Sequence, residues 1–472
     1  MREVRIRDTM SGELRSLDPG REVGIYACGP TVYSRVHIGN ARPFVIFSLL
    51  ARFLKSEGYE TRLAINVTDI NDKIYAAAAE AGVGSATLAA EMTAAYFEDT
   101  GRLGLGRPDA EPLASETIDA IVELIATLVE DGHAYESGGD VYFSVRSFDG
   151  YGKLSHRPTE EMEQGEDDSG SLKRDRLDFA LWKGRKEGED SSWDSPWGPG
   201  RPGWHIECSA MAEAELGELP FAIHGGGSDL VFPHHENEIA QSEAARGRPL
   251  AKIWMHNGMI ETDAAKMSKS EGNIFQLSEA LDRFGPEAVV SYLISGHYRQ
   301  PLAFGAEQLN EAVARVDRLR NFLRSRDDTG QDLERADRSG TGADGAGTGL
   351  AATSVAAGAL SEFRDALADD FNTPRAMSIA FDLVRRANQE EVPGAGAALA
   401  EMLELVGLGS LAAAGDDDGP PAEALELLGQ REAARAERDF ARADRIRDRL
   451  DELGWEVRDS ADGASLVPRP GR

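Results

Sequence analysis

Four residues of the sequence have the side chains and spacing of a metal site. The chain has only two cysteines, Cys28 and Cys208, and His234 and Glu238 lie four residues apart. On a helix, residues four apart face the same side. Together the four would form a Cys₂HisGlu set, which suits tetrahedral zinc. Two other interpretations stay open: ordinary buried cysteines, or a disulfide, although an intracellular chain of this size seldom depends on one.

Two further segments are suited to binding phosphate. The first is CGPTVYSRVHIGN at 28–40, where His37 and Gly39 stand at an expected helix start. Backbone amides at a helix N-terminus and an imidazole can face a phosphate together. The second is KMSKS at 266–270, which holds two of the nine lysines of this arginine-rich chain. Lysine suits the β- and γ-phosphates of ATP, and a solvated Lys/Ser loop is the alternative.

This pair of motifs resembles the signature pair of the class I aminoacyl-tRNA synthetases. In that family the two motifs lie on opposite halves of a Rossmann-like sheet and close over ATP. The resemblance implies that His37 and Asn40 contact the transferring phosphate, and that Lys266 and Lys269 contact the leaving pyrophosphate. Asn40 stands where the first motif often ends in His, and its amide can still donate a hydrogen bond.

A third group of residues resembles the cysteinyl members of this class. It comprises GRPGWHIECSAM at 200–211 and IHGGGSDLVFPHHENE at 223–238, and five of the nine histidines fall between 205 and 256. The match runs from Cys28 to about Asn273. It reappears at ADDFNTP, residues 368–374, and in the C-terminal unit. The resemblance therefore covers nearly the whole chain.

The resemblance assigns functions to individual residues. The implied ligands of one zinc ion per chain are Cys28, Cys208, His234 and Glu238. The residues implied to bind ATP are Gly39, Gly227, Asp229 and Lys269, and those implied to line the cysteine pocket are Thr68, Trp204 and His224. Two departures from the family pattern are Asn71, where many relatives have Asp, and Leu466, where we expect Trp.

The resemblance also implies a reaction and its partners. The carboxylate of L-cysteine attacks the α-phosphate of ATP, which is bound with Mg²⁺, and the cysteinyl group then passes from the adenylate to tRNA(Cys). Serine and cysteine are nearly isosteric, so a pocket based on shape would separate them poorly. Zinc binds a thiolate far better than a neutral hydroxyl. Selection by zinc makes an editing domain unnecessary, and we expect none.

The elements that must position Cys28 form one βαβ unit. Residues 22–28 are a short apolar strand, 41–56 carry apolar side chains at helical spacing, and 60–70 return to a strand pattern. Such a unit belongs to a parallel sheet, and ligands bind beyond the carboxyl ends of its strands. We therefore expect an α/β fold, in which a Rossmann-like parallel-sheet catalytic domain presents Cys28 at its ligand-binding edge.

Composition divides the chain into three parts, which the resemblance implies are a catalytic domain, a helical bundle and a small C-terminal anticodon-binding domain. Their expected bounds are 1–306, 307–414 and 422–472, in that order, with a linker at 415–421. The catalytic domain has an insertion at about 113–200, which begins with an amphipathic helix at 113–133. A Gly-rich segment at about 327–358 interrupts the bundle, and we expect it to be flexible.

The C-terminal unit carries a regular set of arginines. Their steps of three and four predict one stripe along a single helix: Arg431, Arg435, Arg438, Arg442, Arg445 and Arg449. An apolar stripe is expected to face elsewhere, with Phe440, Ala443, Ile446, Leu450 and Leu453. Residues 431–449 hold seven Arg and five acidic residues, a local charge of +2. The stripe fits a surface that follows tRNA phosphates, or a solvated face with ion pairs within the helix.

The composition indicates a cytoplasmic protein. Acidic residues number 82 against 51 Lys plus Arg, which gives a net charge of −31. Spread acidity with little Lys is typical of proteins from salt-accumulating, halophilic archaea. No apolar run approaches the length of a membrane span, and the segment 1–12 is too polar for a secretory signal. We expect no membrane contact, and a monomer.

Two other functions would use part of the same chemistry. A related enzyme joins cysteine to an amino sugar in mycothiol synthesis. It uses zinc and ATP in the same way, but it needs no anticodon domain. A non-catalytic zinc protein that binds tRNA would need no lysine loop for pyrophosphate. The C-terminal unit argues against the first, and residues 266–270 argue against the second.

Overall fold

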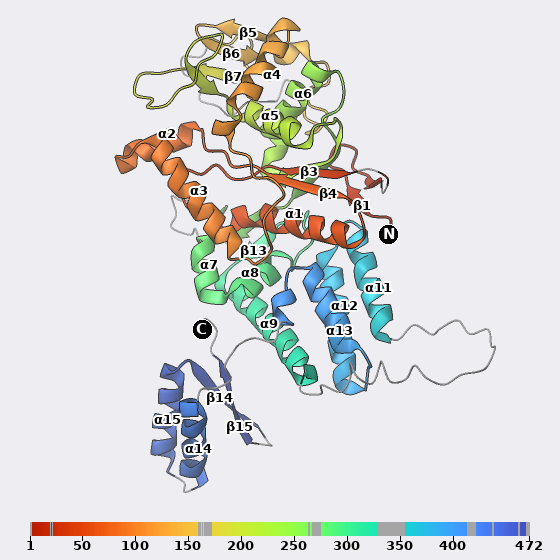
Figure 1. The fold of residues 1–472 in the computed structure, drawn as a ribbon, viewed down its shortest axis with the longest axis vertical. Helices are drawn as coiled ribbons and strands as arrows, with labels where there is room; N and C mark the ends of the chain where they lie inside the picture. The colour runs from red at the N-terminus through yellow and green to blue at the C-terminus, as the bar shows by residue number, and fades with distance from the viewer. Residues whose placement is uncertain are drawn as a thin grey trace, which may run out of the picture.

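The protein is described from a computed structural model, in which a parallel sheet lies between an insertion on one side and helix α1 with a helical bundle on the other (Figure 1). The residues that the structure describes are 2–18, 20, 22–158, 162, 164, 172–262, 265–266, 275–327, 355–412, 422–436, 439–460 and 463–468. Among them, no helix is long and apolar enough to cross a membrane.

Four parallel strands form the sheet that positions the site. They are β3 (Val23–Ala27), β4 (Thr61–Ile65), β9 (Phe221–Gly227) and β10 (Ala251–Asn257). Their order is β10-β9-β3-β4, and every pairing is parallel. β3 is buried along its whole length, which is why its composition is continuously apolar. The predicted α/β fold and its first βαβ unit are confirmed.

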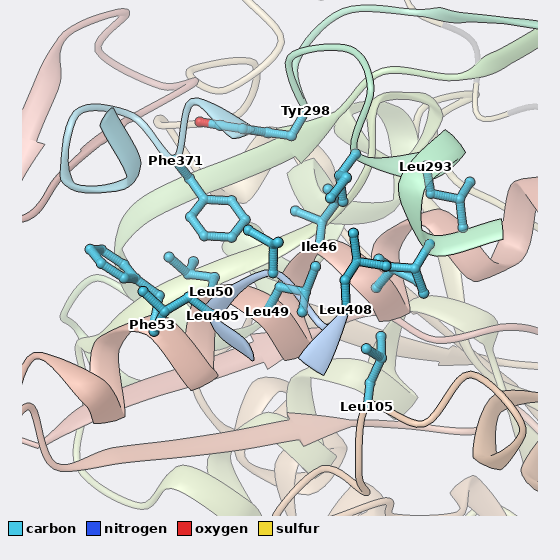
Figure 2. Packing of buried hydrophobic residues seen from close by; sticks show 14 of the residues in the cluster. Ile46, Leu49, Leu50, Phe53, Leu105, Leu293, Tyr298, Phe371, Leu405 and Leu408 are labelled. Carbon is cyan, nitrogen blue, oxygen red and sulfur yellow. The ribbon is translucent and has the colours of Figure 1, made fainter. Parts of the chain in front are cut away.

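Helix α1 (Ile38–Ser56) connects β3 to β4 and packs against the bundle. Figure 2 shows its apolar side chains in contact with residues from later in the chain, and those labelled on α1 are Ile46, Leu49, Leu50 and Phe53. Leu405 and Leu408 approach from the bundle, and all of these side chains are buried. Burying each one contributes about 1.5–3 kcal/mol. The helix that begins at the first motif therefore joins the catalytic domain to the bundle.

The insertion has its own small sheet. The elements between β4 and that sheet are α2 (Asp72–Ala81), α3 (Ser85–Gly101), η1 (Ala114–Glu116) and α4 (Ile118–Glu130). The sheet is antiparallel in the order β5-β6-β7-β8, with bounds Ala134–Ser137, Asp140–Phe143, Phe179–Gly184 and Gly200–Pro202. The predicted helix at 113–133 is confirmed as η1 followed by α4. Asn71, the first departure from the family pattern, caps α2 by accepting a hydrogen bond from the backbone N–H of Lys73 at 3.1 Å.

The chain then returns to the parallel sheet and leaves it again. The returning helices are α5 (Trp204–Leu216) and α6 (Glu236–Arg246), with short turns at Ser228–Leu230 and Val231–His235 before α6. After β10 come β11 (Ile260–Thr262), β12 (Ala265–Lys266), α7 (Leu277–Phe284), α8 (Pro286–Leu293) and β13 (Leu302–Phe304). A short hairpin, β1 (Arg5–Arg7) and β2 (Leu14–Ser16), precedes the sheet.

The bundle consists of α9 (Ala306–Asp327), α11 (Val355–Ala368), α12 (Thr373–Gln389) and α13 (Ala395–Leu405). The predicted helix at 307–326 is confirmed. Most of the segment predicted to be flexible, at about 327–358, lies outside the described residues. Its last part was wrongly included, because α11 already begins at Val355. The linker at 415–421 also lies outside the described residues.

The C-terminal unit corrects the prediction of a single arginine-bearing helix. Two helices, α14 (Ala422–Ala436) and α15 (Phe440–Glu452), are followed by a hairpin of β14 (Trp455–Ser460) and β15 (Gly463–Pro468). Asp439 caps α15 by accepting from the backbone N–H of Arg442 at 3.0 Å, so the chain turns where the stripe was expected to continue.

Individual side chains of this unit also differ from the prediction. Arg431, predicted to belong to the arginine stripe, is buried, whereas Phe440 of the predicted apolar stripe is 61% exposed at the start of α15. Ala443, Ile446 and Leu450 of that apolar stripe are buried. Leu466, the second departure from the family pattern, packs against the small core that includes Ile446 and Leu450.

Candidate metal centre and nucleotide site

Four segments bring the predicted zinc ligands together beyond the carboxyl end of β3. Cys28 directly follows that strand, Cys208 lies on α5, His234 lies in the turn before α6 and Glu238 lies on α6. All four side chains are buried, and their ligand atoms lie within 4.8 Å of one another. The structure therefore assembles the set that the sequence proposed, although its members are spread between positions 28 and 238.

The distances within this cluster fit a tetrahedral ion. The Sγ atom of Cys28 lies 3.6 Å from Nε2 of His234 and 3.6 Å from Oε1 of Glu238, and those two atoms are 3.1 Å apart. With zinc–ligand bonds of about 2.0–2.3 Å, neighbouring ligand atoms lie about 3.3–3.8 Å apart. Within the described residues, Oε2 of Glu238 is buried and accepts no hydrogen bond, although Nε2 of His224 lies 3.2 Å from it. The cluster thus matches zinc in donor types, with two of the three distances inside that range and the third 0.2 Å shorter.

Burial and mutual contact make the two thiols unequal. Burial raises the pKa of Cys28 well above its ordinary value. A hydrogen bond from Cys28 lowers the pKa of Cys208 to about 6, against the opposing effects of burial and Glu238. Burial alone would lower the pKa of His234, but the charges of Glu238 and Cys208 raise it. Their surroundings therefore shift the pKa values of the two thiols in opposite directions.

Two histidines that the sequence did not assign to the metal complete a second cluster. His224 and His235, with Cys28 and Glu238, also have ligand atoms within 4.8 Å of one another. Nε2 of His224 lies 3.7 Å from Sγ of Cys28 and 3.2 Å from Oε2 of Glu238. The two clusters share Cys28 and Glu238. The crowding of histidines between 205 and 256 was the available signal, but it could not say which rings face the same point.

Neighbouring rings hold the histidines of both clusters in place. Nδ1 of His235 lies 2.7 Å from Nε2 of His256, whose Nδ1 lies 2.8 Å from the hydroxyl of Thr9. Burial lowers the pKa of His256 to about 3, so this ring is neutral at ordinary pH. Trp204 stacks on His234 with 4.4 Å between ring centroids and an interplanar angle of 23°. Such contacts fix the orientation of metal-binding rings.

The first motif forms the start of helix α1. His37 is the N-cap, and its Nδ1 accepts a hydrogen bond from the backbone N–H of Gly39 at 3.0 Å. The side-chain oxygen of Asn40 accepts from the backbone N–H of His37 at 3.2 Å. The two residues form a reciprocal capping box. Asn40, which departs from the family pattern, therefore has a structural function at this helix start.

The remaining pocket residues surround the carboxyl ends of the same strands. Thr68 is buried after β4, and its hydroxyl accepts from the side-chain amide of Asn66 at 3.2 Å. Asn66 in turn accepts from the backbone N–H of Gly29 at 2.9 Å. A Cβ at Gly29 would lie 1.8 Å from the carbonyl oxygen of Asn66, so only glycine fits there. Asp229 is exposed just beyond the end of β9, which Gly227 completes.

The lysine motif is described only at its upstream end. The backbone of Lys266 lies in β12, and Lys269 lies outside the described residues. Immediately downstream, the carbonyl of Phe275 accepts from the backbone N–H of Ile38 at 3.1 Å, and the N–H of Leu277 donates to Val36 at 3.0 Å. The described residues that follow the lysine motif therefore form backbone hydrogen bonds directly with the first motif.

Family models match most of this chain. The model described as tRNA synthetases class I (C) catalytic domain matches residues 15–314, and a DALR domain matches 362–408. The model described as Cysteinyl-tRNA ligase anticodon binding domain matches 417–464. The match to the catalytic model covers more than half of the chain, and the three matches follow one another in the order of the predicted domains.

Curated relatives and solved structures agree with these matches. The chain is 45% identical to the cysteine–tRNA ligase of Geobacter sulfurreducens, with 98% of this chain and 99% of the relative covered. It is 44% identical to that of Chromohalobacter salexigens, with 96% of each covered. A Mycobacterium tuberculosis methionyl-tRNA synthetase bound by methionyl-adenylate has the same fold, with a TM-score of 0.61 at 16% identity over 83% of this chain and 93% of that one. The chain therefore belongs to the cysteine–tRNA ligase family of the class I aminoacyl-tRNA synthetases.

Proposed function

We propose that this protein joins L-cysteine to tRNA(Cys) with ATP, through a cysteinyl-adenylate, and that it acts as a cytoplasmic monomer. The observation that carries the proposal is the convergence of Cys28, Cys208, His234 and Glu238 at the edge of the sheet where α1 begins. A candidate site for a thiolate-binding metal thus follows the same strand that leads into a helix start suited to phosphate. A substrate with a thiol at one end and a reacting carboxylate at the other suits that arrangement.

Zinc held by these four residues would bind the substrate's thiol as a thiolate, which a serine hydroxyl cannot match. The protein supplies the surroundings of that contact. His224, Trp204 and Thr68 would line the cysteine, and the first two rings are packed against buried aromatic or imidazole neighbours. A rigid pocket of this kind would accept both cysteine and serine, so the choice between them would depend on whether sulfur or oxygen binds the zinc.

Activation requires positioning and charge stabilisation more than covalent help. The cysteine carboxylate attacks the α-phosphate in line, and pyrophosphate leaves with Mg²⁺. His37 and Asn40 would face the transferring phosphate from the start of α1, where backbone N–H groups favour negative charge. Lys266 and Lys269 would neutralise the pyrophosphate. The remaining ATP contacts would come from Gly39, Gly227 and Asp229, whose carboxylate can accept from a ribose hydroxyl.

The C-terminal unit would bind the anticodon stem of the tRNA. Four arginines there are exposed among the described residues of α15: Arg442, Arg445, Arg447 and Arg449. Two of them also form ion pairs within the unit, Arg447 with Asp444 at 3.4 Å and Arg449 with Glu452 at 2.8 Å. Phosphate would compete with these partners, which suits a surface that binds tRNA transiently.

The proposal is tested by two reactions measured on the same preparation. Cysteine-dependent exchange of pyrophosphate into ATP reports activation, and attachment of radiolabelled cysteine to tRNA(Cys) reports transfer. We expect both, with exchange strongly reduced when serine replaces cysteine. Exchange without charging, together with ligation of cysteine to an amino sugar, would replace the proposal by the mycothiol-type reaction. Charging with serine as readily as with cysteine would refute selection by the metal.

A further inference from the structure

An arginine on the first-motif helix is buried without a carboxylate. Arg42 lies one turn into α1 with no exposed surface, and within the described chain it forms no ion pair. Burial lowers its pKa to about 10. Its guanidinium donates instead to four backbone carbonyls, those of Gly258 at 2.5 Å, Gln300 at 2.8 Å, His297 at 3.2 Å and Met259 at 3.4 Å. A buried charge is costly, so these bonds must offset that cost.

The carbonyls that Arg42 binds belong to the support of the lysine motif. Gly258 leads directly into β11, which pairs with β12, the strand that contains Lys266. The backbone N–H of Gly258 donates to Tyr298 at 2.7 Å. A Cβ at Gly258 would lie 2.3 Å from the backbone of Gln300, so the two segments are in close contact. Residues 297–300 therefore pack against the start of the segment that leads through β11 to the upstream end of the motif.

The same helix also holds the downstream end of the motif. The N–H of Ile38, the first residue of α1, donates to the carbonyl of Phe275 at 3.1 Å. Ile38 and Arg42 are four residues apart and lie on the same side of α1. One turn of α1 thus fixes both ends of the segment that carries the two lysines.

Residues 297–300 are held from their other side by the bundle. Asp370 accepts hydrogen bonds from the hydroxyl of Tyr298 at 2.7 Å, from Nε of Arg299 at 2.8 Å and from the backbone N–H of Arg7 at 2.9 Å. Asp370 and Phe371 both have positive φ, 61° and 46°. Each such residue costs about 1–3 kcal/mol and persists only where its surroundings enforce that backbone conformation. The contacts of Asp370 supply that enforcement, and Figure 2 shows Tyr298 and Phe371 packed above α1.

We propose that Arg42 and Asp370 are positioning residues for adenylate formation, an inference that rests on the proposed function. They hold residues 297–300 between α1 and the bundle. Arg42 donates hydrogen bonds to backbone carbonyls of this segment, and Asp370 accepts hydrogen bonds from its side chains. These contacts fix the position from which Lys266 and Lys269 reach the leaving pyrophosphate. Neither positioning residue is among those proposed to bind cysteine, zinc or ATP. Their loss should therefore slow the chemical step and leave substrate binding and zinc content unchanged.

The experiment measures single-turnover adenylate formation at saturating cysteine and ATP, together with cysteine affinity, zinc content and Tm. Arg42→Met should lower the rate constant about 10- to 100-fold, because a small displacement of a catalytic group has an effect of that size. Asp370→Asn should lower it roughly threefold to tenfold, since the amide still accepts one hydrogen bond. The matched control is Arg364→Met, which removes a different contact between bundle and catalytic domain, the ion pair with Glu57 at 2.6 Å. It should lower Tm and leave the rate within twofold.

Other variants keep the test decisive if Arg42→Met folds poorly. Arg42→Lys retains the charge but not the forked guanidinium that reaches four carbonyls, so it should recover part of the rate. The double variant Arg42→Lys with Asp370→Asn should lose less than the product of the single losses, because both act through residues 297–300.

Two results would overturn the inference. One is a rate unchanged in folded Arg42→Met or Arg42→Lys. The other is a rate that falls equally in Arg364→Met. That result would mean that Arg42 and Asp370 act only through the general stability of the fold. Failure of the wild-type protein to activate cysteine would refute the proposed function itself, and the inference with it. Normal wild-type activation with unaffected Arg42 variants would refute the inference alone.

Discussion

The Nδ1 atom of His205 lies 2.9 Å from the Nδ1 atom of His234, and both rings are buried. This contact leaves Nε2 of His234 facing Cys28 and Glu238. Burial lowers the pKa of His205 well below its ordinary value, so its ring is neutral. A neutral ring that fixes one nitrogen of a ligand determines which nitrogen reaches the metal.

Replacing His205 should therefore weaken zinc binding without removing a ligand. His205→Phe keeps an aromatic ring but loses the contact to His234, and we expect zinc affinity to fall about 10- to 100-fold. Competition with a chromophoric chelator measures this change. His133→Phe, on the insertion, is the control and should leave affinity unaltered. An unaltered affinity in His205→Phe would mean that His234 is oriented by other contacts.

Two substitutions separate the overlapping clusters. Cys208 belongs only to the Cys₂HisGlu cluster, and His235 only to the cluster with His224. Cys208→Ser should lose zinc and cysteine activation together, because an alcohol is a weak zinc ligand. His235→Asn should retain about one zinc per chain. Metal analysis of the two purified variants shows which cluster binds zinc. Loss of zinc in His235→Asn with zinc retained in Cys208→Ser would assign the ion to the cluster with His224.

Lys269→Ala should slow adenylate formation far more than it weakens cysteine binding. The negative charge that this ammonium meets develops as pyrophosphate departs, so its loss acts on the transition state. Single-turnover kinetics and equilibrium binding of cysteine measure the two effects. Lys252→Ala, on β10, is the control for loss of a lysine charge. A change confined to cysteine affinity would rule out the leaving-group function.

Glu57 should make stability depend on pH in the acid range. Burial alone would raise its pKa, but the hydrogen bonds and charges of Arg364 and Arg2 lower it below the ordinary value. A pKa lower in the folded state gives stabilisation that is complete above the unfolded value, about 4.3, and is lost as pH falls through the folded value. Glu57→Gln should therefore lower Tm at pH 7, and the difference from wild type should shrink below about pH 4.

Thermal denaturation from pH 7 to pH 3 measures this trend. Glu60→Gln, an exposed neighbour, should show a small and constant difference. A difference for Glu57→Gln that grew on acidification would contradict the sign of the shift.

Removing the residues after about Gly419 should spare cysteine-dependent pyrophosphate exchange and sharply reduce tRNA charging. Both motifs and all four zinc candidates precede residue 274. With a net charge of −31, the full-length protein should charge tRNA weakly at low salt and better when its acidic surface is screened. Both reactions are measured across a salt series. Full charging by the truncated protein would show that the C-terminal unit does not read the anticodon.

Local pattern and motif chemistry predicted a large part of this molecule. The first βαβ unit was recognisable from sequence, because the spacing of apolar residues within a strand or helix indicates which of its side chains are buried. This unit comprises β3, α1 and β4. Cys28 and Cys208 were recognisable because cysteine is rare in this chain. The expected placement of Arg431 and Phe440 on stripes of one helix was wrong, because regular spacing cannot reveal that α14 ends at Ala436 and that Asp439 caps a second helix.

The remaining site residues depend on contacts that sequence order does not contain. His235 and His256 face one another only because β9 and β10 are neighbours in the sheet. Arg42 resembles a surface residue of an amphipathic helix in sequence, whereas its partners are backbone carbonyls about 215 to 260 residues later. Backbone partners leave no trace in side-chain composition.

The strand order β10-β9-β3-β4 also determines when the site can exist during synthesis. β3, α1 and β4 can pair as soon as they leave the ribosome, but β9 must insert beside β3 after more than 150 further residues. At roughly 5–20 residues per second, Glu238 follows Cys28 by about 10–40 s. Throughout that interval the nascent chain carries Cys28 at an open sheet edge, so each newly made molecule passes through a stage with an unprotected thiol before its metal site can close.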